Sequence, residues 1–430
     1  MSHRTRQLSV SSLARVEGEG GLRLVIDGEQ VDEVELQIYE PPRFFEAFLR
    51  GRQYTEVLDI TARICGICPV AYQSSGWNAI EDACGVEIGG QIAALRRLLY
   101  CGEWISSHTL HIYLLHAVDF LGYQDAITLA QDHRAEVERG LALKKVGNAV
   151  LETVGGRAIH PVNPRIGGFH RAPTREELAR LAEQLRVARD QALETVTWVA
   201  GFDIPDVEVD HELVAVTHPD HYAIENGTVA TAGGLRVPPS EYPEHAVEHQ
   251  VPHSTALHST FDGRRYLTGP LARYSINSAQ LSPLAREAAS AAGLGDTCRN
   301  PFRSIVVRAV EVVYAVDEAL RIIENYERPD PPAVPVPPRA GVGHGVSEAP
   351  RGLLYHRYEL DADGSIKSAT IVPPTAQNQP AIEDDLRRVV GMNLDIDDAA
   401  LTALCEQTIR NYDPCISCST HFLDLRIERR

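Results

Sequence analysis

The N-terminal part of the chain alternates between apolar and polar positions, whereas much of the rest has helical spacing. Two alternating runs lie on either side of the turn dipeptide Asp27-Gly28. A period of two is typical of strands with one buried face, so the pattern predicts a β-hairpin between Leu8 and Tyr39. The alternating apolar residues are Leu22, Leu24 and Ile26, then Val34, Leu36 and Ile38.

Apolar residues spaced three and four apart predict long helices over residues 69–84, 98–121, 174–198 and 300–327. Pro69 suits a first helical turn, Cys84-Gly85 a helix end, and Thr174 with Glu177 forms a capping box. Residues 203–281 are rich in Gly, Pro and His, which favours loops and short strands. The chain is therefore expected to be α+β and mainly α, with a core of long helices and a small N-terminal β-sheet.

The helix over residues 98–121 carries His108, His111 and His116. Their spacing lacks the HExxH pattern of a helical zinc site. We expect these histidines to be buried and hydrogen-bonded to backbone or polar groups instead of binding a metal.

Composition excludes several classes of protein. A chain of 430 residues with 44% hydrophobic residues can bury a large core. Its net charge of -18 excludes nucleic acid as a partner, because phosphate binding needs a basic surface. No apolar run reaches the roughly 18–20 residues of a membrane span, and no targeting segment is recognisable at the N-terminus. We expect neither a direct membrane span nor an export signal within this chain.

The eight cysteines fall into two groups. Cys84, Cys101, Cys298 and Cys405 stand singly, without the spacing of a disulfide framework, which favours a reducing, cytoplasmic compartment.

The other four form two CxxC pairs, Cys65 with Cys68 and Cys415 with Cys418, about 350 residues apart. Brought together, such pairs supply four thiolates to soft metals. A structural zinc site is the usual alternative, although zinc pairs normally lie within a few tens of residues. Because the two halves come from opposite ends, we expect residues 1–421 to fold as a single domain.

The sequences around these pairs add specificity. Residues 63–68 match RxCGxC, and residues 413–421 match DPCxxCxxH, so the chain resembles the large subunit of nickel–iron hydrogenases from about Ser9 to His421. The resemblance implies the large-subunit fold. It further implies that Cys65 and Cys415 bind nickel terminally, while Cys68 and Cys418 bridge nickel to an iron that carries two cyanides and one carbon monoxide.

The same resemblance implies a magnesium ion held by Glu46, in the helix that begins near Pro41, by Gln379 and by His421. Residues 372–379 resemble the loop that donates hydrogen bonds to the diatomic ligands of iron. Thr375 is the candidate donor in this loop, and Gln379 would supply a backbone carbonyl to magnesium.

Two further motifs imply catalytic roles. Arg15-Val16-Glu17-Gly18 matches the segment whose Glu carries protons away from the metals, and Glu348-Ala349-Pro350-Arg351-Gly352 matches the segment whose Arg lies over the open metal position. Splitting dihydrogen needs a metal Lewis acid beside a base. We expect Cys415 to accept the proton first and Glu17 next, with Arg351 supplying charge and position. The chain departs from the family pattern at Tyr72, usually His, and at Ser107, often Asp.

The single cysteines cannot build another iron–sulfur cluster, so electrons must leave through a partner. The resemblance implies an iron–sulfur small subunit and, as in cytoplasmic NAD(P)-linked enzymes, diaphorase subunits with flavin (FAD) and iron–sulfur clusters. We expect reversible cleavage of H2 to protons and electrons. Residues 422–430 are expected to be removed by a maturation endopeptidase after nickel-insertion chaperones have acted. A hydrogen-sensing regulatory subunit is the main alternative; a quinone-reductase subunit of the same fold would lack the cysteines.

Overall fold

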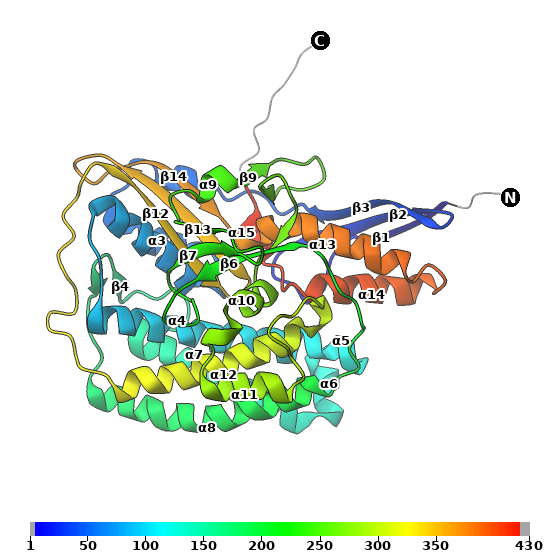
Figure 1. Cartoon of the computed structure of the whole chain (residues 1–430), viewed down its shortest axis with the longest axis horizontal. Coiled ribbons are helices and arrows are strands. Elements are labelled where there is room, and N and C mark those ends of the chain that lie inside the picture. Colours follow the sequence, from blue (N-terminus) through cyan, green and yellow to red (C-terminus); the bar gives the residue numbers. More distant parts are fainter. Residues whose placement is uncertain (1–4, 422–430) are drawn as a thin grey trace, which may run out of the picture.

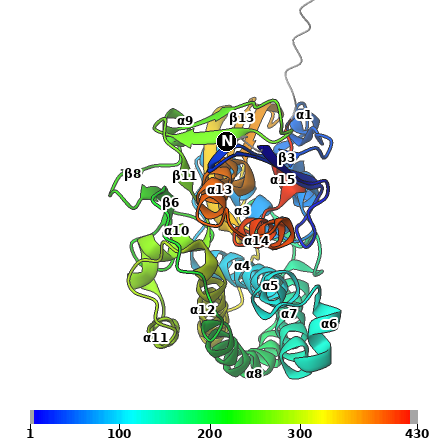
Figure 2. The same ribbon diagram turned by 90° about the vertical axis from the view of Figure 1, so that its right-hand side faces the viewer.

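The computed structural model describes residues 5–421 and arranges them in two layers (Figures 1 and 2). One layer consists mostly of long helices: α4 (Gly90–Leu110), α7 (Arg134–Gly155), α8 (Arg175–Ala200) and α12 (Ser304–Glu324), with the shorter α5 (Ala117–Leu121), α6 (Ala126–Asp132) and α11 (Pro283–Ala291). Helix α4 packs against α7 and α12, and α12 packs against α8. The four predicted helical segments are all observed as helices.

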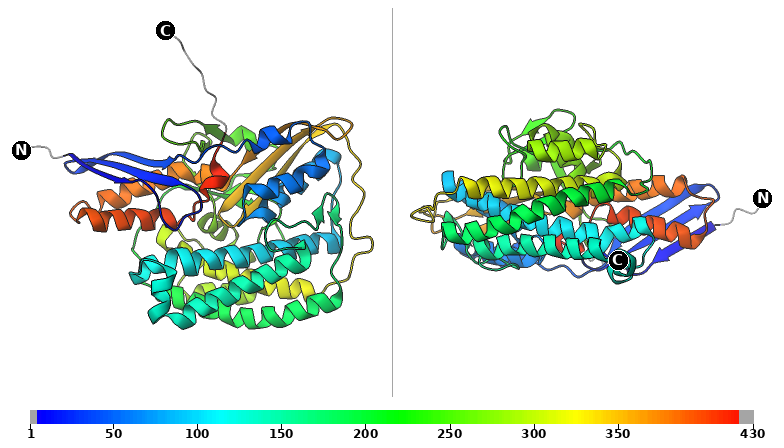
Figure 3. Two further views of the ribbon diagram at one scale, coloured as in Figure 1. Left: turned by 180° about the vertical axis from the view of Figure 1, so that it is seen from behind. Right: turned by 90° about the horizontal axis from the view of Figure 1, so that it is seen from below.

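Two three-stranded antiparallel sheets form the other layer with α3 (Pro69–Cys84), α13 (Pro374–Gly391) and α14 (Asp398–Arg410). The first sheet contains β1 (Thr5–Val10), β2 (Gly20–Asp27) and β3 (Gln30–Ile38), and the second contains β12 (Gly341–Ala349), β13 (Gly352–Leu360) and β14 (Ile366–Val372). Helix α3 packs on β12 and β13, whereas α13 packs on β3. Viewed from behind, the N-terminal sheet lies beside α13 and α14 (Figure 3).

The predicted hairpin is confirmed by β2 and β3, whose register pairs Leu24 with Val34. Strand β1 adds a third strand by pairing Leu8 with Leu24. The alternating apolar residues of β2 and β3 are buried, because successive side chains of a strand point to opposite faces of the sheet and one face packs on α13.

The region expected to contain loops and short strands does so, but it also contains a helix that the weak periodicity did not predict, α10 (Pro270–Asn277). The remaining elements are short. They are β4 (Pro164–Arg165), β5 (Gly168–Phe169), β6 (Glu212–Thr217), β7 (Thr228–Thr231), β8 (Arg236–Val237), β9 (Ala246–His249), β10 (His258–Phe261), β11 (Tyr266–Leu267), α1 (Phe45–Leu49), α2 (Val57–Thr61), α9 (Tyr242–His245) and α15 (Ile416–Ser419); single turns of 3-10 helix are η1 (Tyr54–Glu56), η2 (Ala62–Ile64), η4 (Ser278–Gln280) and η5 (Pro301–Arg303).

Helix α3 begins and ends where the sequence predicted. Gly85 follows its last residue with a φ of 70°, the left-handed conformation that glycine adopts without strain. Its first turn is capped from another helix: the buried Glu103 of α4 accepts hydrogen bonds from the N–H groups of Val70, at 2.6 Å, and Ala71, at 3.1 Å. These donors have no partner within α3, so Glu103 fixes the start of α3 on α4.

Helix α4 continues into a π-helical segment, η3 (His111–His116). The three histidines of this stretch are buried, as expected. His111 pairs through Nε2 with the carbonyl of Arg410, at 2.7 Å, and His108 Nε2 lies 3.0 Å from Glu311. His108 has only this close approach to a carboxylate and no hydrogen bond, and the expectation of polar partners is wrong for His116, whose two ring nitrogens have no hydrogen-bond partner within the described residues.

The main hydrophobic cluster draws residues from the first sheet, the helix bundle and the C-terminal cysteine pair, so the two layers share one core. Among residues 5–421 no helix is long and apolar enough to cross a membrane.

Candidate metal centre

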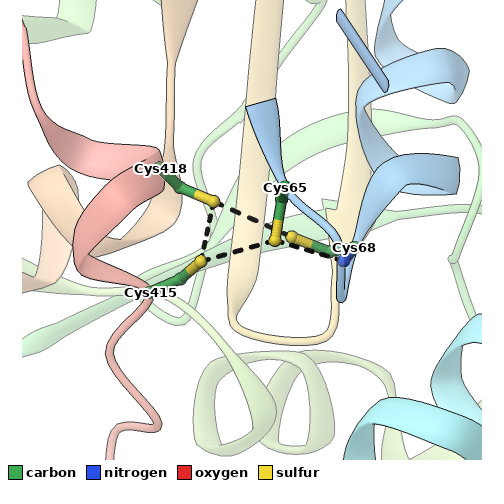
Figure 4. A group of neighbouring side chains, drawn as sticks. All are labelled: Cys65, Cys68, Cys415 and Cys418. Atoms are coloured by element: carbon green, nitrogen blue, oxygen red, sulfur yellow. Dashed lines mark hydrogen bonds between the residues drawn. The ribbon is translucent and has the colours of Figure 1, made fainter. Parts of the chain in front are cut away.

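The fold brings the two CxxC pairs together between the layers, and all four side chains point toward one another (Figure 4). The sulfur of Cys415 lies 2.7 Å from that of Cys418 and 3.6 Å from that of Cys65, while Cys68 and Cys418 are 4.0 Å apart. The four Sγ atoms all lie within 4.8 Å of one another, and all four residues are buried. Such a donor set suits soft metal ions.

Local structure places each pair. Cys68 precedes the first residue of α3, and Cys415 precedes the first residue of α15, so one cysteine of each pair is positioned by the start of a helix. The N–H groups of Ile67 and Cys68 both lie 3.3 Å from the Cys65 sulfur and donate to it. A turn that aims N–H groups at sulfur favours the thiolate form.

The thiols differ in their pKa values. Hydrogen bonding with Cys415 is the largest reason why the pKa of Cys65 lies well below its usual range. Burial, and then contact with Cys418, raise the pKa of Cys415 well above its usual range. Four sulfurs this close cannot all be thiolates without a bound cation, because like charges repel strongly in a buried environment. Divalent cations would remove this conflict, so the donor set fits metal ions better than free thiols.

Glu17 reaches the same cluster from the N-terminal part of the chain. Its Oε2 accepts a hydrogen bond from the Cys415 thiol at 3.1 Å and from the Ser417 N–H at 3.1 Å, and its carbonyl accepts the Ile416 N–H at 2.9 Å. Glu17 and Cys415 form an isolated parallel β-bridge. The carboxylate is therefore held against a sulfur by backbone as well as side-chain contacts.

Arg351 is buried and lies against the C-terminal motif. Its Nε donates to the carbonyl of Asp413 at 2.7 Å, and its Nη2 donates to the Asp413 carboxylate at 3.1 Å. Although burial opposes the charge, Asp413 and the thiols of Cys415 and Cys68 raise the pKa of Arg351 well above its usual range. Its Nη1 is buried and donates to no described residue, so one N–H group remains for another acceptor. No local sequence pattern predicts the pairing of Arg351 with Asp413, which lies two residues before Cys415.

Thr375 contacts the cysteine loop directly. Its Oγ1 accepts a hydrogen bond from the Cys415 N–H at 2.9 Å, and the residue is buried. Because a hydroxyl both donates and accepts, its proton remains available to a second group.

A cavity of about 310 Å³ opens beside Cys418 and contains two of the expected magnesium ligands. His421 Nε2 lies 3.3 Å from Glu46 Oε2. Two further groups that sequence inspection missed line this cavity, Glu248 and Ile371. Glu248 Oε1 is buried without a hydrogen-bond partner among the described residues. Carboxylate oxygens are the ligands that magnesium prefers, so the donor set fits a hard cation.

Gln379 does not line this cavity. Residues 374–379 form the first turns of α13 instead of a loop, and the Gln379 side chain donates to the Leu36 carbonyl at 3.0 Å and to Ser254 Oγ at 2.9 Å. On the cavity side, the Ile371 N–H donates to Glu46 Oε1 at 2.8 Å. The N–H and C=O of one antiparallel-strand residue point the same way, so Ile371 turns its carbonyl toward the cavity.

Both departures from the family pattern are buried, and Tyr72 lies close enough to the four cysteines to interact with them electrostatically. Tyr72 is buried, and its hydroxyl has no partner in the described part of the chain. Burial, and next the charge of Cys418, raise the pKa of Tyr72 well above its usual range. Ser107 Oγ is likewise buried without a described partner.

Comparison with known proteins gives a consistent result. A family model described as nickel-dependent hydrogenase matches residues 43–154 and 240–421. The alpha subunit of sulfhydrogenase 1 from Pyrococcus furiosus is 34% identical and aligns over 97% of this chain and 98% of that protein. The beta subunit of the NAD-reducing hydrogenase HoxS from Cupriavidus necator is 27% identical, over 97% of this chain and 95% of that protein.

Among solved structures, an NAD+-reducing nickel–iron hydrogenase in the H2-reduced state has a TM-score of 0.85 and 25% identity, covering 97% of this chain and 99% of that chain. A nickel–iron–selenium hydrogenase variant from Desulfovibrio vulgaris Hildenborough has a TM-score of 0.81 at 22% identity, covering 98% of this chain and 100% of that chain, and supports the fold alone. The large-subunit fold expected from the sequence is confirmed. The chain belongs to the nickel-dependent hydrogenase family and is a large, catalytic subunit of a hydrogenase.

Proposed function

We propose that this chain cleaves H2 reversibly at a nickel–iron centre held by Cys65, Cys68, Cys415 and Cys418. The observation that carries the proposal is the cluster of four buried sulfurs with Glu17 bonded to one of them. When bound, nickel and iron supply the Lewis acid that polarises dihydrogen. The terminal nickel ligands would be Cys65 and Cys415, and the bridging ligands Cys68 and Cys418.

The protein groups around the sulfurs would handle the proton. The Cys415 sulfur would accept it, and Glu17 Oε2, 3.1 Å away, would take it on toward the surface. Arg351 would offset the negative charge of thiolates and cyanides, with Nη1 free to donate toward the centre. Thr375 would orient Cys415 through its N–H group and donate its hydroxyl proton to a diatomic ligand of iron.

A magnesium ion would bind between Glu46 and His421, with the Ile371 carbonyl and the Glu248 carboxylate facing the same cavity. This set replaces Gln379, whose side chain and helix position direct it elsewhere. The ion would tie the C-terminal segment to α1 and β14. Residues 1–421 would form one folding unit, and residues 422–430, which lie outside the described residues, would be removed after His421 by a maturation endopeptidase following nickel insertion.

Electrons would leave through an iron–sulfur small subunit. The alpha and beta subunit names of the relatives, together with the NAD-reducing relative, support a cytoplasmic multisubunit enzyme with diaphorase subunits and NAD(P) as acceptor. The four remaining cysteines are buried, and within residues 5–421 they do not form a second group that could hold an iron–sulfur cluster. Electron transfer away from the centre would therefore need clusters on another subunit.

Purification of the chain with its partner subunits tests this proposal. Elemental analysis should find nickel, iron and magnesium, infrared spectra should show cyanide and carbon monoxide bands, and H2 should reduce NAD+ or NADP+. An isolated complex that contains zinc in place of nickel, or that never consumes H2 with any acceptor, would refute it.

A further inference from the structure

A second group of metal-binding side chains lies away from the cysteines, at the junction of the β9–β10 hairpin and α13 (Figure 1). It consists of His253, His258 and Glu383, whose ligand atoms all lie within 4.8 Å of one another. His253 belongs to the loop between β9 and β10, His258 begins β10, and Glu383 lies in α13.

The distances in this group are close to those of a coordination shell. Glu383 Oε1 lies 2.8 Å from His253 Nε2 and 4.0 Å from His258 Nε2. Ligand bonds of about 2.0–2.2 Å in a tetrahedral shell imply donor atoms roughly 3.3 Å apart, so small movements of the side chains suffice. Glu383 is further fixed by the Leu36 N–H, which donates to Oε1 at 2.9 Å.

His258 provides independent evidence of an absent ligand. Its side chain is only 7% exposed, and Nε2 is buried without a hydrogen-bond partner among the described residues. Neutral imidazole nitrogen is a common metal ligand, so this nitrogen is suited to bind a cation. An unpaired buried ring nitrogen is costly in a folded protein unless something occupies the site.

The surroundings do not oppose a divalent ion. The Arg265 guanidinium, which acts electrostatically on His258, is paired with Asp384. His253 and Glu383 are 18% and 16% exposed, so an ion can reach the site from solvent. We propose that His253, His258 and Glu383 form a second metal site, which binds a divalent first-row transition ion such as zinc through two imidazoles and one carboxylate.

The position of this site gives it a structural role. The loop between β9 and β10 holds the last described residues: the Thr255 carbonyl accepts the His421 N–H at 2.9 Å, and Ala256 forms an isolated bridge with Thr420. The same loop is tied to α13 by the hydrogen bond between Gln379 and Ser254. A metal that joins this loop to Glu383 would therefore stabilise the contacts of the loop with Thr420 and His421.

The test uses the holoenzyme, whose cysteines are already occupied, so that zinc cannot bind them. After dialysis against zinc sulfate, elemental analysis should find one additional zinc per large subunit. X-ray absorption at the zinc edge should show nitrogen and oxygen ligands at about 2.0–2.2 Å and no sulfur. Addition of zinc should also raise the melting temperature.

Two variants and a control decide the assignment. His258→Ala removes one ligand, and Glu383→Gln keeps the shape and the acceptor for Leu36 while losing the charge; both should lose the extra zinc and the thermal shift. His245→Ala is the control, because His245, the last residue of α9, pairs with Asp262 at 2.8 Å beside the same hairpin and has no third ligand among the described residues. Zinc binding unchanged in Glu383→Gln, sulfur in the zinc shell, or no additional zinc in the native enzyme would each overturn the proposal. None of these readouts depends on hydrogen turnover.

Discussion

Glu17 and Cys415, 398 residues apart in the sequence, share a hydrogen bond from thiol to carboxylate of 3.1 Å and a parallel β-bridge. The N-terminal segment therefore closes over the C-terminal cysteine loop, and the carboxylate is fixed where a proton leaving the sulfur would meet it. Surface carboxylates in salt bridges are not usually held in place by backbone contacts of this kind. The fixed position of the Glu17 carboxylate against the Cys415 sulfur therefore supports a role in proton transfer.

Replacing Glu17 with Gln should preserve the hydrogen bond from Ser417 but remove the group that accepts a proton. We expect H2/D2O exchange and turnover to fall by roughly 100-fold or more, with nickel and iron contents unchanged. Glu19→Gln is the control, since Glu19 is exposed and its backbone N–H donates to Glu40. Wild-type exchange in Glu17→Gln would eliminate the proposed relay.

Serine at Cys65 or Cys415 should abolish nickel binding, because a hydroxyl does not replace a thiolate as a soft ligand. Most of the helical fold should remain, since the core extends far beyond the cluster. Circular dichroism and elemental analysis measure the two effects. Cys405→Ser is the matched control: Cys405 is buried outside the cluster, and burial raises its pKa to about 12. Nickel retained in Cys65→Ser would contradict the ligand assignment.

Arg351→Lys keeps a positive charge but loses the planar group that holds Asp413 with two nitrogens while leaving Nη1 free. Activity should fall by about 100-fold with little loss of metal, because lysine cannot reproduce this geometry. The ratio of kcat to metal content measures the effect. Arg265→Lys, at an exposed ion pair, should leave activity unchanged.

His116 should make the protein sensitive to acid. Burial lowers its pKa from 6.5 to about 3 in the folded state, so below pH 6.5 the unfolded chain binds a proton that the folded chain does not. The stabilising contribution of the neutral ring is complete above pH 6.5 and is lost, by up to about 1.4 kcal/mol per pH unit, as the pH falls toward the folded pKa.

Melting temperatures of the holoenzyme at about pH 7.5 and about pH 5.5 measure this loss. His116→Leu should reduce the difference between the two values, whereas His170→Leu, at an exposed position, should not. If the melting temperature fell equally between these two pH values in wild type and His116→Leu, His116 would be protonated in the folded state and the prediction would be wrong.

Cleavage after His421 predicts a definite mass. The large subunit of active, nickel-loaded enzyme should lack residues 422–430 by intact mass spectrometry, and a nickel-free preparation should retain them. Full activity in a subunit that still carries Phe422–Arg430 would refute removal of this extension.

The sequence was most informative where a short local pattern determines the structure. Pro69 and Gly85 mark the ends of α3, and the dipeptide Asp27-Gly28 marks the hairpin, because these signals depend on backbone conformation alone. The cysteine pairs predicted the position of the centre for a similar reason, because the CxxC spacing alone places two sulfurs on one side of a turn.

Other contacts had no local signal. Nothing near Glu103 indicates that it caps α3, since the donors lie about 30 residues away in another helix. Ile371 lines the cavity beside Cys418 and contacts Glu46 through its backbone N–H, so its side chain gives no sequence signal of this position. Gln379 was expected in a loop because residues 372–379 resemble a loop of the family, whereas Pro374 begins α13 and Gln379 lies within that helix.

The 350 residues between Cys65 and Cys415 also separate them in time during synthesis. At roughly 5–20 residues per second, about 20–70 s pass on the ribosome between the first cysteine pair and the second. Throughout that interval Cys65 and Cys68 lack the other two thiols, and for most of it they also lack the Arg351 guanidinium, which precedes Cys415 in the chain. The complete four-sulfur site can thus receive its metals only after translation of both ends, which gives any assembly factor a nearly finished polypeptide as its substrate.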